Sequence, residues 1–233
     1  MRNTLLYIML LLLPSTALRA QDEDIYLMEI GVGGGLMGYL GDFNGSLTKD
    51  LQPMASVLWR YNLSPYMGLK ANASYGKLKG SSADVKTYYP TMAGKTPYEF
   101  NNMLVDVGVA YEYNFWPYGT GRDYRGAQRL TPFIFAGLGA TYASLGDNAD
   151  KGSVLSANVP LGIGVKYKAG KRLNIGLEWA IHFSLSDELD GKKDPYDIQS
   201  TGAFKNTECY STLQFTITYS FKAKCRTCHN EDE

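Results

Sequence analysis

Apolar and polar side chains alternate with a period of two along residues 158–184, interrupted only by a short polar turn at 169–172. Successive side chains of a β-strand leave on opposite faces, so this period predicts two strands joined as a hairpin. One face carries bulky apolar side chains, namely Val159, Leu161, Ile163, Val165, Tyr167, Leu173, Ile175, Leu177, Trp179, Ile181 and Phe183. The other carries small and polar ones, namely Asn158, Gly162, Gly164, Lys166, Lys168, Asn174, Gly176, Glu178, Ala180, His182 and Ser184.

The polarity of the two faces indicates lipid, rather than a protein core, beside the bulky side chains. Small and polar groups would make a poor interior for a soluble sandwich, whereas a transmembrane barrel has a wet lumen and an apolar exterior. Each strand is also long enough, since a spanning strand needs roughly 9–11 residues. The hairpin is therefore predicted to belong to a transmembrane β-barrel.

The same alternation recurs in six further segments of the chain. They cover residues 25–39, 54–63, 67–75, 102–115, 131–143 and 212–221. Residues 131–143 are apolar on both faces, so the side chains that face outward there stay undecided. With the hairpin the segments make eight strands, the minimum for a bacterial barrel. The predicted fold is all-β: an eight-stranded antiparallel transmembrane barrel of the outer-membrane type with up-and-down topology.

Residues 1–20 have the pattern of a secretory signal peptide. Arg2 supplies a positive start, residues 5–13 form an apolar core too short for a spanning helix, and Ala20 ends a small-residue stretch. Cleavage is expected before Gln21, which leaves residues 21–221 as the barrel and 222–233 as a C-terminal tail. The rest of the chain has no run of about 18 apolar residues, so any membrane insertion is expected through the barrel.

Link lengths predict an orientation. If the mature N-terminus is periplasmic, the links at 64–65 and 169–172 are periplasmic and short, and those at 80–98 and 185–207 are external and long. This asymmetry is typical of outer-membrane barrels and places both termini in the periplasm. The link at 116–130 is long although it lies on the periplasmic side, so it is a candidate partner site. Its candidate docking residues are Trp116, Tyr118, Arg122 and Arg125.

Inward positions carry charges of both signs. They are Glu29, Arg60, Lys70, Asp106, Glu112, Lys166, Lys168 and Glu178. An eight-stranded barrel is only wide enough for its side chains to fill it, and an unpaired charge in such a lumen costs several kcal/mol. These side chains are therefore expected to pair in a luminal charge network that closes the barrel. An ion gate or a proton path is the functional alternative, and a free pore is not expected.

Catalytic and nucleotide-binding interpretations find little support. Glu178, His182 and Ser184 suggest a Ser-His-acid hydrolase, but positions two apart on one strand project in parallel and do not converge as a triad must. A hydrogen-bonded luminal histidine is expected instead, with no enzymatic activity. The glycines of residues 31–35 lie inside a predicted strand and precede no helix, so they are no nucleotide loop. The formal net charge of zero suggests no nucleic-acid partner, and no cofactor or small-molecule substrate is expected.

The C-terminal tail carries a Cys-x-x-Cys-His string. It matches a haem-attachment sequence and also offers zinc ligands, but a short tail supplies neither an apolar haem pocket nor a second axial ligand. A disulfide between Cys225 and Cys228 is expected in the oxidising periplasm. Cys209 lies at the far end of the last strand and cannot easily join them. Lys224 and Arg226 make the tail a candidate docking peptide.

Several short motifs together resemble the PorG family over nearly the whole mature chain. They are Glu29–Gly31, Tyr39–Asp42, Arg60–Asn62, Tyr75–Gly80, Phe115–Tyr118, Thr131–Gly137, Asn158–Gly162 and Lys224–Cys228. The resemblance implies an outer-membrane barrel of the Bacteroidota type IX secretion system, linked to the periplasmic ring of the PorK lipoprotein and PorN. That machine exports folded proteins and supports gliding motility in some members. The resemblance implies outer-membrane lipids and these ring proteins as partners, and no catalytic residues. A generic small barrel for membrane integrity or small-molecule passage is the alternative.

Overall fold

The computed structural model describes residues 26–40, 49–81, 99–119, 127–146, 152–186, 189 and 208–223. The predicted signal peptide, Arg122, Arg125 and the tail that holds Lys224, Cys225, Arg226 and Cys228 lie outside these ranges. Among the described residues, no helix is long and apolar enough to cross a membrane.

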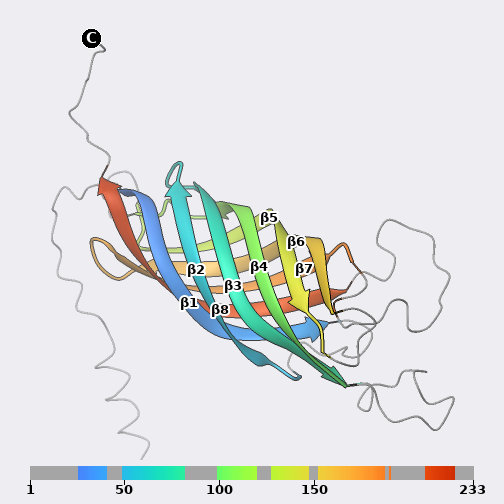
Figure 1. The fold of residues 1–233 in the computed structure, drawn as a ribbon. Coiled ribbons are helices and arrows are strands. Elements are labelled where there is room, and N and C mark those ends of the chain that lie inside the picture. The colour runs from blue at the N-terminus through green and yellow to red at the C-terminus, as the bar shows by residue number, and fades with distance from the viewer. Residues whose placement is uncertain are drawn as a thin grey trace, which may run out of the picture.

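Eight β-strands form one closed barrel (Figure 1). The strands are β1 (Tyr26–Leu40), β2 (Gln52–Asn62), β3 (Met67–Ser81), β4 (Glu99–Asn114), β5 (Leu130–Ser144), β6 (Ser153–Lys168), β7 (Leu173–Ser184) and β8 (Cys209–Ala223). Each strand pairs antiparallel with the next, and β8 closes the barrel against β1, where Val32 pairs with Ile217 and Leu40 with Cys209. The predicted fold class and up-and-down topology are confirmed.

Several strand boundaries differ from the sequence prediction, most clearly in three strands. β3 continues to Ser81, six residues beyond the predicted end at Tyr75. β6 already begins at Ser153, and β8 runs from Cys209 to Ala223, so the first two residues of the predicted tail belong to the barrel. The same period continues into these extensions, because alternate positions such as Tyr210 remain buried. Strand ends were underestimated because the flanking residues are more polar, and polarity alone does not end a strand inside a closed sheet.

The structure settles which way β5 faces. Phe133 and Phe135 point into the lumen and are buried, while Ile134 and Leu138 lie exposed on the outside. The luminal rings fit because β6 presents glycine beside them. A Cβ atom on Gly164 would come within 2.6 Å of the Phe133 ring. A Cβ atom on Gly162 would likewise clash with the Phe135 ring. The inner face of β5 is therefore aromatic, and its space is provided by the glycines of the next strand.

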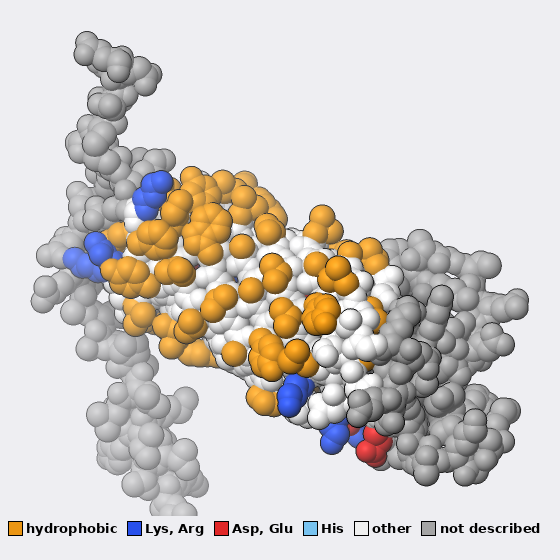
Figure 2. Space-filling model, viewed as in Figure 1, with side chains coloured by type: hydrophobic (Ala, Val, Ile, Leu, Met, Phe, Trp, Pro, Cys, Tyr) orange, Lys and Arg blue, Asp and Glu red, His pale blue; other side chains and the backbone are white. Residues whose placement is uncertain are grey.

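The outer wall carries exposed apolar side chains on every strand, and Figure 2 shows one side of it. Exposed large side chains include Ile30, Val32, Val57, Trp59, Tyr75, Val107, Val109, Ile134, Leu138, Leu161, Ile163, Leu177, Phe215 and Ile217. Leaving such a side chain in water forgoes about 1.5–3 kcal/mol of burial free energy. Because the polar side chains are inside and the apolar ones outside, the surrounding phase that stabilises this arrangement is lipid.

The two ends of the barrel differ in their connections. We call the end with the links 63–66, 115–129 and 169–172 the turn end, and the chain enters β1 and leaves β8 there. We call the opposite end, where the other four links lie, the loop end. The tight turns are stabilised by backbone hydrogen bonds within the turn, such as the 3.0 Å bond from the Gly170 N–H to the Leu173 carbonyl.

Candidate functional site in the barrel lumen

Arg60 lies at the centre of the lumen and contacts carboxylates from three other strands. Its Nη1 lies 2.7 Å from Glu29 of β1, its Nε 2.8 Å from Glu112 of β4, and its Nη2 3.3 Å from Glu178 of β7. Only 2% of its side chain is exposed. Since the guanidinium is planar and has five N–H donors, it can serve three acceptors at once. Arg60 therefore ties together strands that are not neighbours around the barrel.

Two lysines complete the charge balance around these carboxylates. Lys70 Nζ lies 2.6 Å from Glu178 and 3.4 Å from Glu112, and Lys166 Nζ lies 2.8 Å from Glu112. We call this set the central charge cluster; it consists of Glu29, Arg60, Lys70, Glu112, Lys166 and Glu178. Its three cations and three anions cancel, so the cluster carries no net formal charge. Six of the eight inward charges expected from the sequence meet here.

The luminal rings of β5 cover the two ammonium groups. Lys70 Nζ lies 3.9 Å from the centroid of the Phe135 ring, and Lys166 Nζ lies 4.4 Å from that of Phe133. A cation over an aromatic face gains electrostatic attraction that grows when water is excluded. Charged groups and aromatic rings therefore pack against each other at this level of the lumen.

Asp106, which was also predicted to join the network, is not part of the central charge cluster. Its Oδ2 accepts hydrogen bonds from Thr141 Oγ1 at 3.0 Å and from Tyr210 Oη at 2.8 Å, and Asn158 Nδ2 donates to the same oxygen. Asp106 lies six residues along β4 from Glu112, which at the rise of a strand is about 20 Å. The sequence showed that both side chains face inward, but not that they lie at different levels of the lumen.

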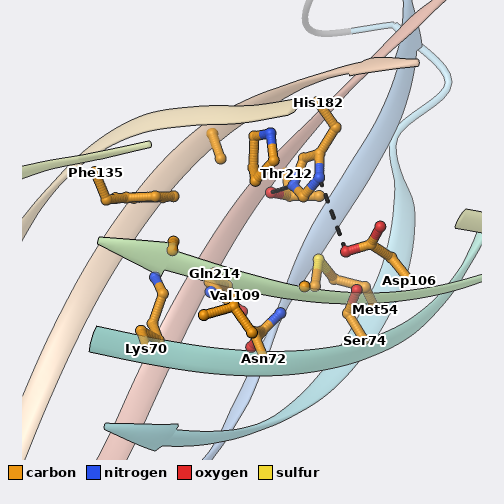
Figure 3. A pocket seen from close by; sticks show the side chains of 14 residues that line it. Met54, Lys70, Asn72, Ser74, Asp106, Val109, Phe135, His182, Thr212 and Gln214 are labelled. Atoms are coloured by element: carbon orange, nitrogen blue, oxygen red, sulfur yellow. Dashed lines mark hydrogen bonds and ion pairs between the residues drawn. The ribbon is translucent and has the colours of Figure 1, made fainter. Parts of the chain in front are cut away.

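A small cavity lies between the central charge cluster and Asp106 (Figure 3). About 30 Å³ is open to the centres of water molecules, and the lining includes Lys70, Asn72, Asp106, His182 and Gln214. Within the described residues, Asn72 Oδ1 and His182 Nδ1 are buried without a protein hydrogen-bond partner. A polar cavity of this size accommodates roughly two water molecules, which is small for an organic ligand.

The three side chains that suggested a hydrolase, Glu178, His182 and Ser184, contact different partners in the lumen. His182 stacks on the Tyr210 ring at 4.4 Å between centroids, and its Nδ1 lies 3.9 Å from Asp106 Oδ1. Ser184 Oγ shares a 2.9 Å hydrogen bond with Ser156, and Glu178 belongs to the central charge cluster. This is the parallel projection expected of alternate residues on one strand.

The turn end of the lumen is covered by Tyr118. Its backbone N–H donates to the Pro65 carbonyl at 2.9 Å, which draws the link after β4 across the barrel mouth. The ring centroid lies 5.5 Å from Lys166 Nζ and 5.7 Å from Lys168 Nζ. Burial raises the pKa of the Tyr118 phenol well above its ordinary value, so the hydroxyl stays protonated.

The position of Tyr118 corrects one predicted docking residue. Its side chain is only 8% exposed and points into the barrel, so it is not available to a partner. Trp116, two residues earlier, is 41% exposed and remains a candidate contact. The alternation of polar and apolar residues could not have predicted that Tyr118 is buried and Trp116 exposed. The reason is that the link is held by its bonds to the neighbouring turn rather than by pairing in the sheet. Lys168, also near this mouth, donates to Asn174 Oδ1 at 3.2 Å.

A closed eight-stranded antiparallel barrel with an apolar wall and a charged, filled lumen is a transmembrane β-barrel of the outer-membrane type. More particularly, this chain belongs to the family described as "Domain of unknown function (DUF6089)", which matches residues 2–230. A search of curated proteins gave no match.

Solved outer-membrane barrels are similar to this chain in fold. Neisserial surface protein A (NspA) is 13% identical with a TM-score of 0.48, and the match covers 83% of this chain and 97% of that one. The attachment invasion locus protein Ail of Yersinia pestis, in complex with a heparin analogue, is 8% identical with a TM-score of 0.45, covering 86% and 100%. OprG of Pseudomonas aeruginosa is 10% identical with a TM-score of 0.43, covering 88% and 100%. At these identities the similarity concerns the fold alone.

Proposed function

We propose that this protein is a non-enzymatic outer-membrane component of the type IX secretion system that anchors the periplasmic PorK/PorN ring. The observation that carries the proposal is the filled lumen. The central charge cluster is neutral and fully paired, and Tyr118 covers the turn end. A barrel closed in this way is better suited to hold a partner at the membrane than to pass a solute.

The assignment to this secretion system is supported by the ordered motifs that resemble the PorG family. The orientation is supported by the connections, since short turns are typically periplasmic in such barrels. We therefore place the turn end and both chain termini in the periplasm. Trp116 then lies on the periplasmic side, where a ring would be met, and the tail that follows Ala223 leaves from the same end.

Co-purification tests the anchoring role directly. The tagged full-length protein, extracted from native membranes, is expected to retain PorK and PorN. Trp116→Ala should weaken their binding about thirtyfold, because a buried aromatic contact in an interface is worth roughly 2 kcal/mol. The matched control is Trp59→Ala, since Trp59 is 42% exposed but lies on the outer wall of β2.

The contribution of the tail is measured in the same experiment. Removing residues 224–233 leaves β8 complete, because that strand ends at Ala223. A wild-type preparation without ring proteins would refute the anchoring role. Equal losses for Trp116→Ala and Trp59→Ala would remove the turn end as the contact, and unchanged recovery after truncation would exclude the tail.

Planar-bilayer recordings test the small-molecule channel alternative. The wild-type protein is expected to give no resolved conductance steps, because the central charge cluster and the β5 rings occupy the lumen of a barrel that is only wide enough for its side chains. An eight-stranded barrel with an unblocked lumen, used as a positive control, should give steps under the same conditions. Reproducible steps from the wild type would favour the channel over the anchor.

A further inference from the structure

Arg172 is held in a fixed position on the outside of the turn end. Its carbonyl accepts a 2.6 Å hydrogen bond from the Ser220 N–H, which ties the turn between β6 and β7 to β8. Its side chain is exposed, and Nε donates to Tyr26 Oη at 3.1 Å while Nη1 donates to Tyr219 Oη at 2.8 Å. The guanidinium carbon lies 5.3 Å and 5.9 Å from the centroids of these two rings.

This arrangement leaves several hydrogen-bond donors on one cation. A guanidinium has five N–H groups, and the two tyrosines take one each, so three remain. Each tyrosine hydroxyl accepts from Arg172 and therefore still has its own hydrogen to donate. The hydrogen bond with Tyr219, followed by that with Tyr26, raises the pKa of Arg172, which keeps its charge. A planar cation with adjacent hydroxyl donors matches the oxygens of a phosphate group.

The surroundings of Arg172 favour an anion from the membrane. Its neighbour Leu173 and its partner Tyr219 are each 47% exposed on the apolar wall, so the guanidinium lies at the rim of that wall. Arginine and tyrosine at such a rim lie at the level of lipid headgroups. Lys171 and Lys222 lie exposed at the same end.

The described acidic side chains lie elsewhere in the barrel. Among the described residues, every Asp and Glu lies in the lumen or near the loop end: Glu29, Asp106, Glu112 and Glu178 in the lumen, and Asp50, Glu99 and Glu208 near the loop end. In the view of Figure 2, the acidic side chains drawn in red lie near the loop end.

We propose that Arg172, Tyr26 and Tyr219 form a binding site for the phosphate diester of a phospholipid headgroup, at the rim of the turn end. The acyl chains of that lipid lie along the exposed Leu173 side of the wall. The site is independent of the secretion role and requires only that the wall faces a bilayer.

Native mass spectrometry of the full-length protein in delipidated detergent micelles tests the site. Titration with a short-chain phosphatidylglycerol is expected to give one bound lipid at the lowest concentrations. Arg172→Ala should weaken that first binding event at least about tenfold, as expected for loss of a charge-assisted contact. The double variant Tyr26→Phe, Tyr219→Phe keeps both rings and the charge, and should weaken binding by a smaller factor.

The matched control is Arg129→Ala, which removes an equal charge from an exposed position at the same end. It should bind as the wild type does. Diacylglycerol with the same acyl chains should give no first-site binding, and inorganic phosphate should compete only far above the lipid concentration. Equal binding by diacylglycerol, equal binding by inorganic phosphate, or equal losses for Arg172→Ala and Arg129→Ala would each overturn the proposal. The heat-dependent gel shift of a folded barrel confirms that each variant compared is folded, and the tyrosine variants decide the matter if Arg172→Ala does not fold.

Discussion

Replacing Arg60 with methionine is expected to destabilise the folded barrel by about 3–5 kcal/mol. Arg60 is the ion-pair partner of Glu29 and shares Glu112 and Glu178 with the lysines. The side chains of Arg60 and of the three carboxylates are 0–2% exposed. Without it, the central charge cluster holds three carboxylates against two ammonium groups, and one buried negative charge lies uncompensated. The measurement is the urea midpoint of unfolding in detergent micelles, followed by the mobility of unheated samples on a gel.

Removing the matching anion should restore much of this loss. In Arg60→Met, Glu29→Gln the cluster is again neutral. The glutamine oxygen can accept from Asn62 as Glu29 does, while its amide N–H can donate to the Thr218 hydroxyl in place of the bond that Glu29 accepts. A double-mutant cycle is therefore expected to give a coupling free energy of about 1–3 kcal/mol. Arg129→Met, at an exposed position, should change stability by less than about 0.5 kcal/mol. A double variant as unstable as the sum of the single ones would show that charge balance does not hold the lumen together.

Placing an arginine at Leu177 is expected to lower the stability of the barrel in a bilayer by about 2–4 kcal/mol. Leu177 faces outward from β7 and is half exposed. It lies four residues beyond the turn, which for a tilted strand is about 10 Å into an apolar band about 25 Å tall. The guanidinium would therefore lie close to the bilayer midplane. The measurement is reversible folding into phospholipid vesicles, followed by tryptophan fluorescence.

Leu173→Arg provides the control for depth. It is the same substitution on the same strand and the same outer face, but Leu173 is the first residue of β7, beside the turn. An arginine there reaches the headgroups, so the expected cost is about 0–1 kcal/mol. Equal costs at the two positions, or no cost at Leu177, would mean that lipid does not surround this wall.

The lumen and the outer wall of the barrel are stabilised by different interactions. The wall depends on the bilayer, whereas the lumen depends on ion pairs and rings that the chain supplies itself. The cavity between the central charge cluster and Asp106, at about 30 Å³, accommodates roughly two waters. Binding is therefore expected at the ends and rim, where Trp116 and Arg172 lie exposed.

The alternation of residues showed which side chains face lipid and which face the lumen, for seven of the eight strands. In β5 it did not, since Phe133 and Ile134 are equally apolar. Packing determines the orientation of β5, because the glycines of β6 leave room for the rings on the inner side only. Tyr118 was misassigned for a related reason: its burial depends on a hydrogen bond to Pro65 in a different link.

The sequence by itself determined the strands, the two faces of the barrel and the presence of opposite charges inside it. These follow from a local rule, since neighbouring side chains on a strand must leave on opposite sides. Only the tertiary structure decided which charges meet. Arg60 reaches Glu178 because the sheet closes on itself, and Asp106 misses the cluster because it lies at another level along the axis. Closure and register are properties of all eight strands together, so no single stretch of the chain contains them.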